Sequence, residues 1–144
     1  MNILEFIQLN HVWNAEPNSP DMKLQVAGLE IILSFYMNAF QYENFDEDDI
    51  GTIVFHDCLL YRLGSPSDEG FFIYGQDRYK QHGIKWGEFY LIKDSDWQIN
   101  FPEPKMLRKG GNLGNANHYL FYFRDETFEC IAGCYDFSVS KQRP

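Results

Sequence analysis

The segment from His118 to Cys134 constrains the fold of this chain more than any other stretch. Its side chains divide between two faces with a period of two residues, which is typical of β-strands. The pattern predicts two antiparallel strands around a tight polar turn. One face carries Tyr119, Phe121, Phe123, Phe128, Cys130 and Ala132, and the other carries His118, Leu120, Tyr122, Arg124, Glu129 and Ile131.

The turn of this hairpin is expected at Asp125 and Glu126. A two-residue turn there would place Tyr122 opposite Glu129, and a longer turn from Arg124 to Thr127 would keep the same pairing. On this register Glu129 either forms a cross-strand polar pair or belongs to a functional site on the polar face.

Short strand-like segments separated by turn-forming residues fill much of the remaining chain. We expect strands at 2–9, 53–63, 86–93 and 97–101, an ambiguous stretch at 71–85 and a long loop at 102–117. Residues 24–37 favour a strand interrupted at Gly28, but Leu29, Ile32, Leu33 and Tyr36 also fit helical spacing, so strand or helix stays open there.

These segments together predict the fold class. The aromatic content of 17% suits pleated, half-buried surfaces, and strong helical patterns are rare. We therefore predict one all-β domain over residues 1–144, an antiparallel sandwich or barrel with long loops and little helix.

The charge balance excludes some partners and permits others. Lysine and arginine total 12 against 21 aspartates and glutamates, a formal net charge of −9. Nucleic-acid binders and proteins attracted to anionic membranes need a basic surface, so the charge argues against both. It permits a basic protein partner, although solubility alone also accounts for it.

The N-terminal sequence and the cysteines indicate the cytoplasm. The first residues, MNILEF, lack the basic and apolar regions of a signal peptide. No run approaches the roughly 18 apolar residues of a membrane span. Three cysteines, an odd number, favour reduced thiols over a disulfide framework.

Three segments resemble an uncharacterised bacterial family of small soluble proteins. They are FHDC running into YRLG at 55–64, SPSDEG at 65–70, and HY with Asp125 and TFECIA in the hairpin at 118–132. The resemblance covers residues 55–134 and implies one soluble domain with this order of strand, turn and hairpin. The family pattern has more His and Pro between Glu69 and Trp97 than this chain has. No activity is known for the family, so the resemblance implies none.

A candidate polar site combines the ionisable residues of two strand regions. Its members are His56, Asp57, His118, Arg124 and Glu129. If the strand at 53–63 lies near the hairpin, they could line the pocket of an enzyme or of a small-ligand binder. The alternative for Asp57 is a structural role, in which it accepts backbone N–H groups or pairs with Arg62 or Arg124.

Metal chemistry receives less support. His56, Cys58, Cys130 and His118 are residue types that zinc prefers, but the paired C-x₂-C spacing of strong zinc sites is missing from the sequence. Phosphate-loop, H-E-x-x-H, G-x-S-x-G and dinucleotide motifs are missing as well. We therefore predict no metal, no cofactor and no catalytic residue, and favour a role other than catalysis.

A candidate partner-binding surface comes from the acidic loops. It comprises Glu43, Asp46, Glu47, Asp48, Asp49, Asp68 and Glu69. Bacterial immunity proteins that neutralise toxins have this size and charge, and opposite charges speed association. The sequence therefore favours a small acidic binding protein, and an immunity-type inhibitor of a basic toxin is the narrower form of this hypothesis. One alternative is an enzyme, or a protein that binds a small ligand or a metal, with its pocket near His56, Asp57, His118 and Glu129. Another is an oligomerising module, and the oligomeric state stays open.

Overall fold

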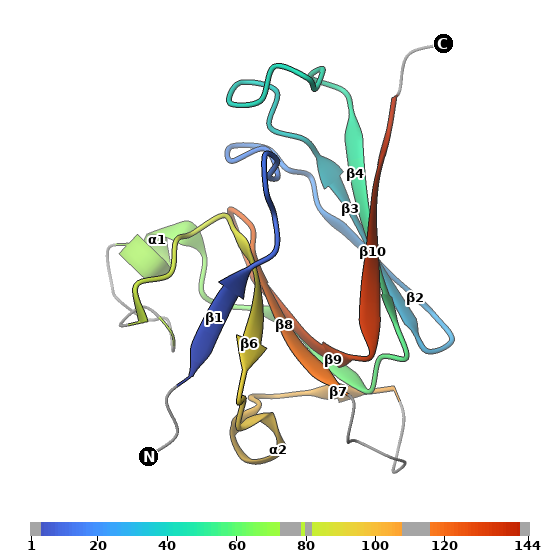
Figure 1. Ribbon diagram of the computed structural model, residues 1–144, viewed down its shortest axis with the longest axis vertical. Coiled ribbons are helices and arrows are strands. Elements are labelled where there is room, and N and C mark those ends of the chain that lie inside the picture. Colours follow the sequence, from blue (N-terminus) through green and yellow to red (C-terminus); the bar gives the residue numbers. More distant parts are fainter. Residues whose placement is uncertain (1–3, 73–78, 80–81, 108–115, 142–144) are drawn as a thin grey trace.

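Two antiparallel β-sheets packed face to face make up the protein (Figure 1). The structure is a computed structural model that describes residues 4–72, 79, 82–107 and 116–141. The first sheet has six strands, in the spatial order β1 (Glu5–Gln8), β6 (Phe89–Lys93), β8 (Asn117–Tyr122), β9 (Thr127–Ala132), β5 (Leu60–Gly64) and β7 (Lys105–Met106). The second has four, in the order β10 (Cys134–Ser140), β4 (Ile50–His56), β3 (Glu30–Tyr36) and β2 (Lys23–Ala27). The predicted antiparallel all-β fold is confirmed, and of the two predicted architectures, sandwich or barrel, the structure is a sandwich.

The predicted hairpin forms the centre of the six-stranded sheet, between β6 and β5. The predicted register is wrong by two residues: Tyr122 pairs with Thr127, and Leu120 pairs with Glu129. The turn is longer than two residues, and within it the Phe123 N–H donates to the Glu126 carbonyl at 2.9 Å. Because a shift of two residues leaves the alternation intact, the side chains keep their predicted faces.

The strand predicted at 53–63 is two strands in different sheets. β4 ends at His56, Asp57 takes a left-handed conformation with φ of 52°, and β5 begins at Leu60 in the other sheet. The chain changes sheet again between β9 and β10, where the Gly133 N–H donates to the His56 carbonyl at 2.9 Å. The two crossings therefore lie side by side.

Residues 24–37 form strands rather than a helix. β2 and β3 pair as a hairpin whose turn contains Gly28, with φ of 63°. Glycine adopts this left-handed conformation at little cost because it has no Cβ. The alternation in β3 places Ile31, Leu33 and Phe35 in the core.

Two short helices lie in the connections of the six-stranded sheet. The strand predicted at 97–101 is wrong, because Trp97–Asn100 forms α2. Part of the ambiguous stretch at 71–85 belongs to α1 (Asp68–Phe72), and residues 73–78 and 80–81 lie outside the described residues. Neither helix in the described part of the chain is long and apolar enough to cross a membrane.

Both faces of the six-stranded sheet are covered. The inner face packs against the second sheet through fully buried aromatic rings such as Phe55, Phe89, Phe121 and Phe128. On the outer face, Leu120 and Tyr122 pack with Phe71 of α1, and Ile131 packs with Trp97 of α2. Polar residues on this outer face are consequently buried, although sequence alternation alone would expose them.

Candidate functional site

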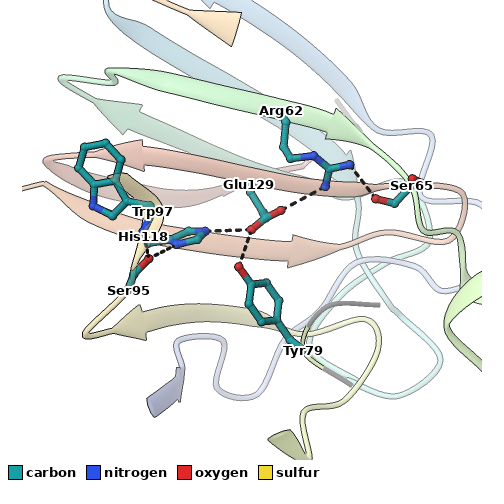
Figure 2. Close-up of polar contacts among 7 residues, drawn as sticks. All are labelled: Arg62, Ser65, Tyr79, Ser95, Trp97, His118 and Glu129. Atoms are coloured by element: carbon teal, nitrogen blue, oxygen red, sulfur yellow. Dashed lines mark hydrogen bonds and ion pairs between the residues drawn. The ribbon is translucent and has the colours of Figure 1, made fainter. Parts of the chain in front are cut away.

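A buried polar network crosses three strands on the outer face of the six-stranded sheet (Figure 2). Glu129 of β9 is at its centre. Arg62 Nη1 donates to Glu129 Oε2 at 3.1 Å, and the hydroxyl of Tyr79 donates to Oε1 at 3.2 Å. His118 Nε2 lies 2.9 Å from the same Oε1.

The strand register brings these side chains together. Arg62 lies directly opposite Glu129 on β5. His118 lies on the other side, on β8, diagonal to Glu129 because its own partner is Ile131. Side chains that are opposite or diagonal on one face of a sheet are within reach of one another. Alternation thus aligns a cation, a carboxylate and an imidazole across β5, β9 and β8.

Ser95 extends the network to the surface. Its hydroxyl oxygen lies 2.5 Å from His118 Nδ1, and it accepts the backbone N–H of Trp97 at 3.2 Å. A carboxylate only accepts hydrogen bonds, so we assign the proton of the neutral imidazole to Nε2. Nδ1 then accepts a hydrogen bond from the Ser95 hydroxyl.

Burial makes this network sensitive to the loss of any partner. The side chains of Glu129 and His118 are each 2% exposed, and the side chain of Arg62 is 12% exposed. A buried charge is tolerated when it is paired and hydrogen-bonded, and the guanidinium supplies that pairing for Glu129. Arg62 is held in turn by its Nη2, which donates to the Ser65 carbonyl at 2.8 Å.

A surface cavity of about 570 Å³ adjoins the serine end of the network. Ser95 and His118 both line it, together with Lys93, Gln98 and Asn117. This volume is within the range of small-molecule sites. The network therefore connects a buried carboxylate to a space that a small ligand can enter.

A second cavity, of about 800 Å³, lies elsewhere, and we call it the acidic cleft. Six carboxylate side chains line it: Glu16, Asp21, Glu47, Asp48, Asp125 and Glu126. Arg124 is the one lysine or arginine among the lining residues. Burial, and then the charge of Asp125, raise the pKa of Glu126.

The structure places the predicted polar site in three separate regions. His118 and Glu129 meet in the network. His56 lies on the second sheet, with Nδ1 2.6 Å from Glu30 Oε2 and Nε2 2.7 Å from Asp136 Oδ2. The sheet change after His56 causes this separation, and Asp57 is exposed at that turn.

The remaining member, Arg124, lies at the acidic cleft. Its side chain is 50% exposed, and its Nη1 donates to the Asn18 carbonyl at 2.8 Å. Its backbone carbonyl accepts the N–H of Asp68 at 2.8 Å, so α1 begins beside the turn of the β8–β9 hairpin.

The predicted partner-binding residues also differ among themselves. Glu47 and Asp48 are exposed and line the acidic cleft, while Glu43 and Asp46 are exposed on the same loop outside its lining. Asp49 is 2% exposed and joins Lys141 Nζ at 2.5 Å, so it holds the loop in place. Asp68 and Glu69 belong to α1, and the side chain of Glu69 lies outside the described part of the structure.

The residues considered for zinc do not converge. Cys58 and Cys130 lie in the core between the sheets, where the thiol of Cys58 donates to the Leu60 carbonyl at 3.3 Å. Among the described residues, no group of three His, Cys, Asp or Glu side chains is arranged to hold a metal ion.

Sequence reasoning missed Ser95 and Tyr79. Both lie in connections, where no periodicity indicates the direction of a side chain. The signal that could have found Ser95 is the tendency of a serine hydroxyl to accept the backbone N–H two residues on, here that of Trp97.

Comparisons with known proteins provide no relative for this chain: no protein-family model, no curated protein and no solved structure matches it.

Proposed function

We propose that this chain is a binding protein for a basic protein partner, and that the acidic cleft receives a positively charged segment of that partner. The observation that carries the proposal is the gathering of six carboxylates around one arginine in a cavity of about 800 Å³. Such a surface attracts lysine and arginine side chains and speeds their association.

An exposed aromatic ring adds an anchor for the partner. Phe40 lines the same cleft and is 79% exposed. Aromatic residues next to charged groups often contribute much of the binding free energy of an interface. The partner segment that fits this surface therefore carries arginine or lysine together with an apolar side chain.

The narrower form of the proposal is an immunity-type inhibitor that neutralises a basic toxin. Support for it comes from the size of the chain, its formal charge of −9 and the position of Glu47 and Asp48 in the cleft. An inhibitor of this kind gains from fast, charge-steered capture of its target.

A peptide titration followed by the amide NMR spectrum tests the binding surface. The probe is a peptide of alternating arginine and tryptophan, and its glutamate–tryptophan counterpart is the control. We expect the basic peptide to shift the resonances of Glu47, Asp48 and residues 123–126, and added salt to weaken its binding.

Charge-reversed variants give this test its control. Glu47→Lys with Asp48→Lys should weaken peptide binding by about tenfold or more. Glu43→Lys with Glu103→Lys changes the net charge equally outside the cleft lining and should have a much smaller effect. Equal losses in both double variants, or shifts confined to another face, would show that the cleft is not the binding surface.

A further inference from the structure

Ser95, His118 and Glu129 form a continuous chain of hydrogen bonds from a solvent-accessible cavity to a buried carboxylate (Figure 2). We propose that Ser95 is the nucleophile of an acyl-transfer site that hydrolyses small carboxylic esters. In this site His118 is the general base, and Glu129 is the residue that positions it.

The geometry satisfies the requirements of an activated serine. The nucleophile must be within hydrogen-bond reach of a base, and a third group must orient the base. Ser95 Oγ lies 2.5 Å from His118 Nδ1, and Nε2 lies 2.9 Å from Glu129 Oε1. Each ring nitrogen has one role, so the proton on Nε2 leaves Nδ1 free to accept the serine proton.

The surroundings of Glu129 keep the imidazole in this orientation. Arg62 of β5 and Tyr79 of a connecting segment hold the carboxylate, so it cannot rotate away from His118 without breaking their hydrogen bonds. The nearly complete burial of His118 and Glu129 excludes water from the link between them. Such preorganised groups lower the cost of the charge that develops on the imidazole.

The cavity gives access to the nucleophile and limits the substrate. Ser95 is half-buried and lines the 570 Å³ cavity together with Lys93 and Gln98, whose side chains carry N–H donors, and with the carboxylates of Glu5 and Asp94. Trp97 and Ala116 add apolar surface to the same lining. A small acyl group with a polar leaving alcohol matches this mixed lining.

The reaction balances without a cofactor. Ser95 Oγ forms a bond to the acyl carbon while its proton moves to His118 Nδ1. The bond from the acyl carbon to the alcohol oxygen then breaks, and the alcohol leaves with that proton. Water, activated by the same nitrogen, attacks the acyl-serine, which releases the carboxylic acid and restores the Ser95 hydroxyl.

This site is separate from the proposed partner-binding surface. The linings of the 570 Å³ cavity and of the acidic cleft have no residue in common. Esterase chemistry and binding of a basic partner can therefore be tested, and can fail, independently.

A fluorophosphonate provides the direct test. It reacts with activated serines: a bond forms between Oγ and phosphorus, and fluoride leaves. We expect the purified full-length protein to take up one label, mapped by peptide mass spectrometry to Ser95, and to release p-nitrophenolate from p-nitrophenyl acetate. Ser95→Ala should lose the label and at least about 100-fold of the esterase rate. Ser138→Ala, on an exposed position of β10, should retain both.

The variant Glu129→Gln tests the positioning role. The labelling rate at Ser95 should fall in this variant, and the pH dependence of labelling should shift relative to the wild type. A native circular dichroism spectrum of the variant would show that loss of fold is not the cause of these changes. Absence of label at Ser95 in the folded wild-type protein, under conditions that label a known serine hydrolase, would overturn the proposal. Equal labelling of several serines would overturn it as well. Both results come from the wild type and remain decisive if a variant fails to fold.

Discussion

Arg62 and Glu129 face each other directly on β5 and β9, with 3.1 Å between Nη1 and Oε2. Arg62→Met would leave a buried carboxylate without its cation. Removing one partner of a buried ion pair costs about 3–5 kcal/mol, and we expect the free energy of unfolding in urea to fall by that amount. Arg124→Met, at a half-exposed side chain, should change it by about 0.5 kcal/mol or less.

The double variant Arg62→Met with Glu129→Gln separates charge from packing. Because glutamine carries no charge, it should recover part of the stability that Arg62→Met alone loses. If the double variant is no more stable than the single variant, the buried charge is not the cause of the loss.

His56 links three strands and makes the stability of the second sheet depend on pH. Hydrogen bonds to Asp136 and to Glu30 raise the pKa of His56, against a smaller opposing effect of desolvation. The folded pKa is above the unfolded value, so the stabilisation is complete below about pH 6.5 and is lost as pH rises through the folded pKa. His56→Gln should therefore be less stable than the wild type at acidic pH and equal to it at alkaline pH.

The size of this effect is small because the partners are exposed. Pairs of this kind contribute about 0.2–1 kcal/mol and weaken with salt. An NMR titration provides the control: Asp136→Asn should lower the pKa of His56. An unchanged pKa in that variant would contradict the assignment of the shift to Asp136.

Gly51 on β4 leaves room for two core side chains of the second sheet. A Cβ at this position would lie 2.6 Å from Met37 Sδ and 2.7 Å from a ring carbon of Phe35. Gly51→Ala should therefore cost about 1–3 kcal/mol through overpacking, measured by thermal or urea unfolding. Gly133→Ala is the matched control, because its Cβ would come no closer than 3.4 Å to another atom. Equal stability of the two variants would show that the core at Gly51 can relax.

The three cysteines should differ in reactivity. Cys134 is exposed, whereas Cys58 and Cys130 are buried, and burial strongly raises the pKa of Cys130. A chromogenic disulfide reagent should titrate one thiol in the folded protein and all three after denaturation. Cys134→Ser should abolish the fast reaction; fast reaction of two thiols in the native wild type would contradict the burial of Cys58 and Cys130.

The hairpin could be predicted from sequence because its two faces differ along the whole of both strands. Its register could not, since the pattern repeats every two residues and pairing Leu120 or Tyr122 with Glu129 satisfies it equally. The sheet change at Asp57 leaves no clear signal either, because a left-handed residue other than glycine looks ordinary in a sequence.

The candidate site was predictable only in part. His118 and Glu129 were found because they interrupt apolar strands. Ser95 and Tyr79 reach them from connecting segments, and their positions depend on how those segments pack over the outer face of the sheet. The separation of His56 from His118 follows from the same sheet change that the sequence concealed.

The two sheet crossings, at Asp57 and at Gly133, lie side by side and join the two sheets at one end of the sandwich. From there the sheets diverge toward the opposite end (Figure 1). Both sheets contribute to the lining of the acidic cleft. Tyr36 and Met37 lie where β3 ends, and residues 123–126 lie at the tip of the β8–β9 hairpin. We therefore expect a core substitution that changes the angle between the sheets to change the shape of the cleft without replacing any of its lining residues.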